Sequence, residues 1–170
     1  MSGLIGGYVR WMDAIADFVG LIAMYLIFVM IGVLLLDVVS DKVFGIPLHW
    51  CVEFAQFTMA AFYFMAGPKT LKDDDHVRMD LIYANISKRG RARMDVVTVL
   101  CLMFYLGVML WGSLSSLTYS YETDQRLPSI WNPSLVPIKA LMVGCIILML
   151  LQSLSLFFKY LAAARGVRPA

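Results

Sequence analysis

Charged residues are scarce in this chain of 170 residues, because Asp, Glu, Lys and Arg together make up only 15% of it. Hydrophobic residues make up 61%, and the mean hydropathy is +0.76. A soluble domain of this size has too little interior to bury so many apolar side chains. The composition therefore predicts an integral membrane protein.

Residues that could hold a cofactor or carry out catalysis are also few. His49 lies near the end of an apolar segment and His76 in a polar loop, and this difference in depth excludes a bis-histidine haem between membrane helices. The chain has no glycine-rich phosphate loop and no nucleophile beside a base. Three cysteines lie in different apolar segments without the spacing of metal ligands, at Cys51, Cys101 and Cys145. We therefore expect no catalytic, cofactor or metal site and no enzyme activity.

Four apolar segments are long enough to cross a membrane, which takes about 20 residues as a helix. They cover residues 15–36, 51–71, 96–117 and 136–160. Because the hydrocarbon offers no water to unpaired backbone groups, segments of this length must be helical. The fold class predicted is an all-α membrane protein with four transmembrane helices in a single membrane domain.

Lysine and arginine are distributed unevenly between the two sides of these spans. Eleven fall on one side, in the N-terminal segment, the central loop of residues 72–95 with its flanks and the C-terminal tail. Only Lys42, Arg126 and Lys139 fall on the other side. Because cations in short loops stay in the cytoplasm, we expect both termini and the central loop to be cytoplasmic. The charge distribution indicates topology and gives no support to nucleic-acid binding.

Two segments are predicted to lie along the membrane surface as amphipathic helices. The N-terminal segment, Met1–Asp17, precedes the first span, and Val77–Ile86 follows the second with its apolar residues on one helical face. We expect Gly90 to break the helix before the third span. A basic run then fits the anionic headgroups of membrane lipids, with Lys88, Arg89, Arg91 and Arg93.

Glu53 is a carboxylate about one turn inside the second apolar segment. A charge in that position is a functional candidate unless it is hydrated or paired. Two interpretations remain open: the side chain reaches headgroup water, or it takes part in a contact with a neighbouring helix. Trp50, at the start of the same segment, is an ordinary aromatic anchor at the interface.

The connection over residues 118–135 is longer than a simple helix hairpin needs. Long ordered connections tend to be functional, so we expect this one to contact a partner on the outer side of the membrane. Before it, Gly112 and Ser116 form a small-xxx-small pair that permits close helix packing.

Two motifs in order carry a resemblance to a known family. Trp50-x-x-Glu53 opens the second span, Ala66-Gly67 supplies small residues, and His76-Val77-Arg78-Met79-Asp80 follows. With this spacing and topology, the chain resembles the small, DctQ-like membrane subunit of tripartite ATP-independent periplasmic (TRAP) transporters. The resemblance implies contact with the partner subunit through Trp50, Glu53, Gly67, His76 and Asp80.

The resemblance also implies a function and partners. The chain would belong to a sodium-driven importer in the cytoplasmic (inner) membrane of a bacterium or archaeon. A periplasmic substrate-binding protein would deliver a small, carboxylate-bearing solute, and a large membrane subunit would carry it while the small subunit braces that subunit's scaffold. The outer connection would supply contacts to the binding protein, through Glu122, Asp124, Arg126 and Trp131. The alternative is a small redox or quinone-interacting anchor subunit, which the optical spectrum of a bound haem or flavin would reveal.

Overall fold

The computed structural model describes residues 3–73 and 88–164 of the chain. Nearly all of them lie in four long α-helices, which are α1 (Gly3–Val39), α2 (His49–Lys72), α4 (Lys88–Glu122) and α5 (Val136–Ala164). These residues form no β-strand, although an isolated antiparallel bridge joins Arg126 to Ser134. The prediction of an all-α protein is confirmed. The predicted surface helix Val77–Ile86 falls outside the described residues.

Three stretches of helix are long and apolar enough to cross a membrane, at Gly6–Phe44, Met94–Glu122 and Val136–Ala162. They support a multi-pass membrane protein. Helix α2 is not among the three because polar side chains such as Glu53 and Gln56 lower its hydropathy. Its 24 residues would nevertheless extend about 36 Å, which exceeds the hydrocarbon thickness of about 30 Å.

Helix α1 is continuous over 37 residues, or about 55 Å. Residues 3–17 form its first part and are not the separate surface helix that the sequence suggested. The helix is continuous for two reasons. No proline interrupts it, and its first turns pack against the rest of the chain. Met12 and Ala16 are each only 1% exposed.

The turn between α1 and α2 is short, as the Phe44–Pro47 sequence predicts. A single π-helical turn, Ser40–Phe44, ends at Gly45, whose φ of 67° is a left-handed conformation that glycine adopts without strain. The amide of Leu48 then donates a hydrogen bond of 3.3 Å to Asp37 Oδ1. This carboxylate therefore ties the end of α1 to the start of α2.

Helix α4 begins at Lys88 and passes through Gly90 without interruption. The expectation that Gly90 would break the helix is therefore wrong. A glycine inside a helix costs only about 1 kcal/mol relative to alanine, which a helix of 35 residues can tolerate. The third apolar segment of the sequence is thus the central part of a longer helix.

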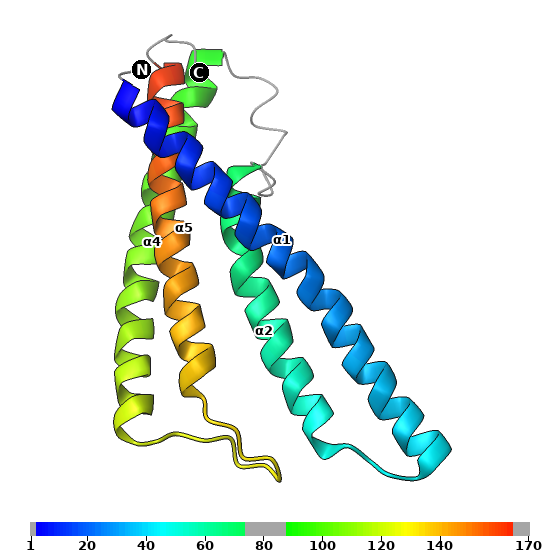
Figure 1. Cartoon of the computed structure of the whole chain (residues 1–170). Coiled ribbons are helices and arrows are strands. Elements are labelled where there is room, and N and C mark those ends of the chain that lie inside the picture. The colour runs from blue at the N-terminus through cyan, green and yellow to red at the C-terminus, as the bar shows by residue number, and fades with distance from the viewer. Residues whose placement is uncertain (1–2, 74–87, 165–170) are drawn as a thin grey trace.

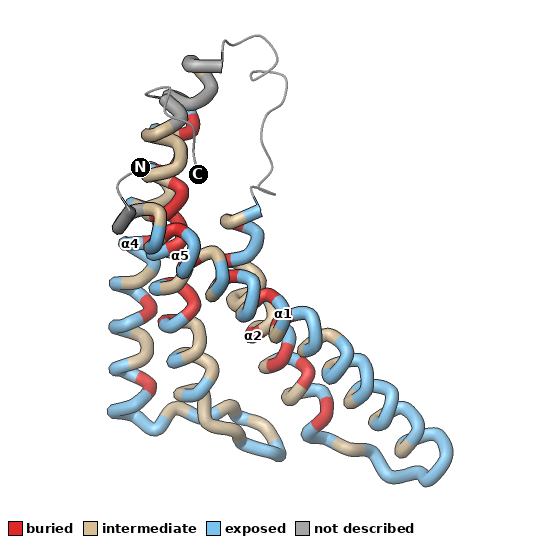
Figure 2. The backbone as a smooth tube through the Cα atoms, turned by 45° about the horizontal axis from the view of Figure 1, so that its top comes forward, coloured by how far each residue is buried: buried red, intermediate tan, exposed pale blue. Residues whose placement is uncertain are grey.

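The helices form two antiparallel pairs, α1 with α2 and α4 with α5, which are joined at one end and diverge toward the other (Figure 1). We call the joined end, with Lys69, Lys72 and Lys159, the basic end. The other end, with Gly45 and residues 123–135, is the turn end. At the basic end Leu71, Val99 and Leu156 form a buried core shared by α2, α4 and α5. Figure 2 shows that the outward sides of α1 and α4 are mostly exposed.

Candidate functional site

Trp50 and Trp131, which are 81 positions apart in the sequence, meet at the turn end. Their ring centroids are 6.5 Å apart, and Trp50 also lies edge-on to Phe54 with a centroid distance of 6.1 Å. Aromatic pairs at these distances contribute about 0.5–1.5 kcal/mol beyond their buried area. The connection between α4 and α5 is therefore fastened to the start of α2, as its course in Figure 1 also shows.

Glu53 lies one turn further along α2 and is half-buried. Its Oε2 atom is buried and has no hydrogen-bond partner in the described part of the chain. An unpaired carboxylate oxygen in an apolar surrounding is unfavourable, because it has lost water without gaining a donor. Within residues 3–73 and 88–164, the Oε2 atom therefore lacks the contact that would balance its burial.

Glu53 belongs to one face of α2. The residues on this face recur at intervals of three or four: Glu53, Phe57, Ala60, Phe64, Gly67 and Leu71. At the basic end the face packs against α5, where a Cβ atom at Gly67 would lie 2.7 Å from the Met149 sulfur. Toward the turn end, where the helix pairs diverge, the same face from Glu53 to Phe64 is only half-buried.

The connection between α4 and α5 is a small folded hairpin. Backbone hydrogen bonds of 3.0 Å run from Leu127 to Pro133 and from Leu135 to Gln125. The predicted partner-binding residues Glu122, Asp124, Arg126 and Trp131 are all exposed. Arg126 Nη2 lies 3.1 Å from Asp124 Oδ2, an exposed ion pair whose contribution to stability is small.

Lys139, at the start of α5, holds the hairpin in place through hydrogen bonds. The amino-acid sequence did not predict this role for Lys139. Its ammonium donates to the hydroxyl of Ser120, to Gln125 Oε1 at 2.9 Å and to the Ser116 carbonyl at 3.4 Å. Ser120 is fully buried. A cation at the carboxyl end of α4 also meets the negative end of the helix dipole. The signal for it in the sequence is weak: two serines four residues apart and one lysine early in the last span.

A second polar cluster joins α1 to α5 at the basic end. Lys159 Nζ lies 2.9 Å from Asp13 Oδ2, and the amide of Gln152, which is fully buried, donates to Asp13 Oδ1 at 2.9 Å. The hydroxyl of Tyr8 donates to the Leu151 carbonyl at 2.9 Å. These bonds explain why the first turns of α1 pack against α5.

Lys72 joins α2 to α1 by donating a hydrogen bond to Asp17 Oδ2. This hydrogen bond raises the pKa of the Lys72 ammonium above its ordinary value. The lysine therefore stays charged throughout the physiological range.

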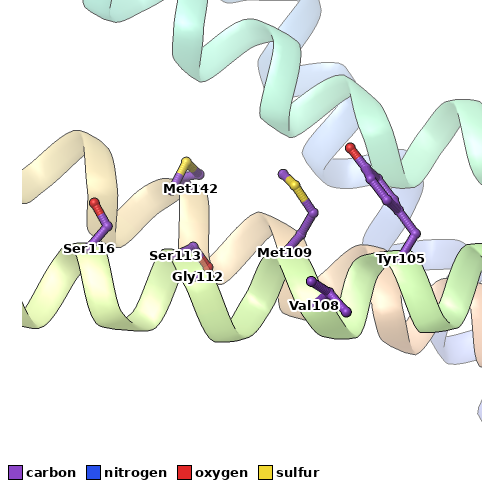
Figure 3. Close-up of a pocket in the computed structure, with 7 residues that line it drawn as sticks. All are labelled: Tyr105, Val108, Met109, Gly112, Ser113, Ser116 and Met142. Carbon is purple, nitrogen blue, oxygen red and sulfur yellow. The ribbon is translucent and has the colours of Figure 1, made fainter.

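A shallow apolar groove of about 320 Å³ follows α4 near α5 (Figure 3). Tyr105, Met109, Gly112, Ser116 and, from α5, Met142 are among its lining residues. The predicted small-xxx-small pair thus lies in one surface hollow. A Cβ atom at Gly112 would meet nothing within 4 Å, so no segment among the described residues covers it.

The remaining predicted residues are placed only in part. His76 and Asp80 lie outside the described residues. The first turns of α4 contain the four basic residues predicted to contact lipid, Lys88, Arg89, Arg91 and Arg93. The structure describes the backbone of these residues but not their side chains. Within the described ranges, no three His, Cys, Asp or Glu side chains gather as a metal site would require.

Comparison with known proteins identifies relatives of the chain. Residues 30–163 match the family described as tripartite ATP-independent periplasmic transporters, DctQ component. The chain is also 25% identical over 120 residues to the isethionate TRAP transporter permease protein DctMQ of Oleidesulfovibrio alaskensis. That alignment covers 65% of this chain and 19% of the relative, so the chain spans about a fifth of the relative's length. No solved structure matches the chain.

Proposed function

This chain belongs to the DctQ component family of the tripartite ATP-independent periplasmic transporters, and from this premise we propose that it braces the large membrane subunit of such a transporter. The observation that carries the proposal is a bundle whose apolar helix faces are left uncovered. Among them, Phe28 is 65%, Phe104 76% and Trp111 81% exposed. Side chains of this kind suit contact with lipid and with other membrane helices.

The proposed topology has four spans with both termini in the cytoplasm. In addition to the three apolar helices, we propose that α2 crosses the membrane. It is antiparallel to α1, and its length exceeds the hydrocarbon thickness. The excess of Lys and Arg at the basic end supports a cytoplasmic location for that end. The protein would then be a multi-pass protein of the cytoplasmic (inner) membrane of a bacterium or archaeon.

The docking surface for the large subunit comprises the faces that the diverging helix pairs leave open. The groove around Gly112 and Ser116 admits the backbone of another helix closely. Glu53, across the opening on α2, offers a carboxylate oxygen that lacks a donor within the described chain. We propose that a donor from the large subunit pairs with Glu53, with Trp50 and Gly67 positioning α2 for this contact. The family resemblance adds His76 and Asp80 to the assembly residues.

The transporter itself would take up a small, carboxylate-bearing solute with sodium, after delivery by a periplasmic binding protein. In this chain the exposed residues of the hairpin between α4 and α5 would contact that binding protein: Glu122, Asp124, Arg126 and Trp131. Lys139 and Trp50 hold the hairpin in one shape, which reduces the entropy lost on docking. The basic residues Lys88, Arg89, Arg91 and Arg93 would contact anionic lipid headgroups.

Affinity purification of the chain from its native membrane tests the central proposal. We expect a large multi-span protein to co-purify with it. Gly112→Leu should reduce the amount recovered about tenfold, because a side chain in the groove costs the interface roughly 1.4 kcal/mol or more.

The matched control is Gly107→Leu on the same helix, where a Cβ atom likewise meets nothing within 4 Å. It lies on the face of α4 opposite the groove, between Phe104 and Trp111, which we assign to contact with lipid, so we expect recovery to stay unchanged. Purification of the chain as a stable monomer without a large partner would refute the bracing role.

A further inference from the structure

We propose that a groove between α1 and α2 at the basic end binds one phospholipid, whose headgroup phosphate accepts hydrogen bonds from Lys69. The proposal rests on the proposed placement of α2 as a membrane span and is independent of the large subunit. Residues 20–27 of α1, which form one wall, precede the residues matched by the family.

The groove has a volume of about 320 Å³ and changes character along its length. Leu21, Met24, Ile27 and Phe62 form its apolar part. Lys69, Thr70 and Asp73 line it where α2 approaches the basic end. From Phe62 to Asp73 the helix rises about 16 Å, so the apolar and polar parts follow one another along the proposed membrane normal. An amphiphile has the same sequence of apolar chain and polar headgroup.

Lys69 is available to a ligand at this site. Its side chain is exposed and makes no hydrogen bond or ion pair with the described part of the chain. The neighbouring Lys72 makes the hydrogen-bonded ion pair with Asp17, and Lys69 interacts with this carboxylate only electrostatically, without a hydrogen bond. A charge-assisted hydrogen bond to phosphate is among the stronger contacts that an ammonium can make.

Gly20 sets the position of Lys69. A Cβ atom at Gly20 would overlap Lys69 Cδ and lie 2.9 Å from its Cβ. Only glycine therefore allows the lysine stem to lie directly on α1, beside the apolar part of the groove. The stem of Lys69 thus lies on α1 at the edge of the groove, and in the proposed complex its ammonium reaches the phosphate of the bound lipid.

The charges at the groove indicate the type of headgroup. Lys69 attracts a phosphate, but Asp73 at the same end repels a headgroup with a further negative charge. A headgroup that combines phosphate with an amine meets both side chains favourably. A phospholipid with an ethanolamine headgroup thus fits better than one with a glycerol headgroup, and diacylglycerol lacks the phosphate altogether.

Native mass spectrometry of the purified full chain tests the proposal after incubation with equal amounts of phosphatidylethanolamine, phosphatidylglycerol and diacylglycerol. We expect one retained phosphatidylethanolamine. Lys69→Gln should reduce its retention about fivefold, because one cation near the headgroup is lost. Lys42→Gln, at an exposed lysine of the turn end, is the control and should retain the lipid.

A second pair of variants changes the groove and leaves the charge in place. Gly20→Leu fills the groove and should abolish retention of the lipid. Gly32→Leu on the same helix places its side chain in open space and should leave lipid retention unchanged. Circular dichroism must show equal helix content in both. Gly20→Leu also changes the packing of α1 on α2. Lys69→Gln leaves that packing in place and therefore tests the lipid site independently.

Several results would overturn the assignment. One is that Lys69→Gln retains as much phosphatidylethanolamine as the parent chain. A second is that diacylglycerol is retained as strongly as phosphatidylethanolamine, or that phosphatidylglycerol is preferred. A third is that excess inorganic phosphate displaces the lipid. The last result would indicate a simple anion site. None of these measurements involves the large subunit, so they can fail while the co-purification experiment succeeds.

Discussion

Among single residues, three half-buried charged side chains fall into two kinds: Asp13, Lys139 and Glu53. Asp13 and Lys139 each have several hydrogen bonds, which balance the loss of water on burial. Glu53 is different, because its Oε2 atom is buried without a donor in the described ranges. A side chain that is unfavourable in the isolated chain is a reasonable point of contact for a partner.

Glu53→Gln should therefore act in opposite directions on stability and assembly. Replacing the carboxylate with a neutral amide lowers the desolvation cost but leaves a polar group in place, so the free energy of unfolding of the isolated chain should rise by about 1 kcal/mol. In the assembled transporter, loss of a charge-assisted hydrogen bond should weaken association about tenfold or more. Thermal unfolding of the isolated chain and co-purification with the large subunit measure the two effects.

The control for this prediction is Asp41→Asn, which removes an exposed carboxylate at the turn end. It should change neither quantity. If Glu53→Gln leaves assembly intact, the carboxylate is merely hydrated and the proposed contact is absent.

Among the structural elements, the hairpin between α4 and α5 shows how a loop on a membrane protein becomes a defined surface. Lys139 and Ser120 fix its start, and Trp50 contacts Trp131 near its tip. The exposed Asp124 and Arg126 form an ion pair of little energetic weight. These charges can thus be altered without loss of the hairpin.

Arg126→Glu should weaken binding of the periplasmic binding protein to the assembled transporter about tenfold, mainly by slowing association, because charges at an interface rim steer encounter. Arg126→Lys keeps the charge and should change affinity less than about twofold. Surface plasmon resonance at low and moderate salt measures both. Unaltered association by Arg126→Glu would remove this side chain from the docking surface.

In the whole molecule, two helix pairs are held together at one end and diverge at the other (Figure 1). The buried core of Leu71, Val99 and Leu156 and the bonds of Asp13 and Asp17 all lie at the basic end. The buried apolar contacts between the two helix pairs are therefore concentrated there, while the turn end leaves apolar and small residues open. This shape suits a brace that receives a partner on its open side.

The proposed topology can be checked with single cysteines in a background that lacks Cys51, Cys101 and Cys145. Lys42→Cys should react with a membrane-impermeant thiol reagent in intact cells, and Asp73→Cys only after lysis. The two sites flank α2, so opposite accessibility requires that α2 crosses the membrane. Equal labelling of both from outside would contradict the fourth span.

Much of this organisation follows from local sequence properties. The long apolar runs predict the helices, and Phe44-Gly45-Ile46-Pro47 predicts the turn because its glycine and proline restrict the backbone. Trp50 and Glu53 stand out because their side chains are unusual for their places in an apolar segment. These inferences need only neighbouring residues, and for that reason they could be made without coordinates.

Contacts between distant residues could not be foreseen in this way. Gly90 does not break the helix before the third span, and residues 3–17 form the first part of α1, since the energy of a long helix and of its packing exceeds weak local preferences. The pairing of Lys139 with Gln125, and of Asp13 with Lys159, depends on how the helices pack.

The amino-acid sequence by itself determined that this protein is an all-α membrane protein of the DctQ type, because hydropathy and short motifs are properties of neighbouring residues. Only the tertiary structure decided which polar groups are paired, because hydrogen bonds between helices depend on their relative positions. It left Glu53 without a donor within the described chain and placed Lys69 over Gly20 beside an apolar groove. Both features arise from the crossing of helices and not from the order of residues along one of them.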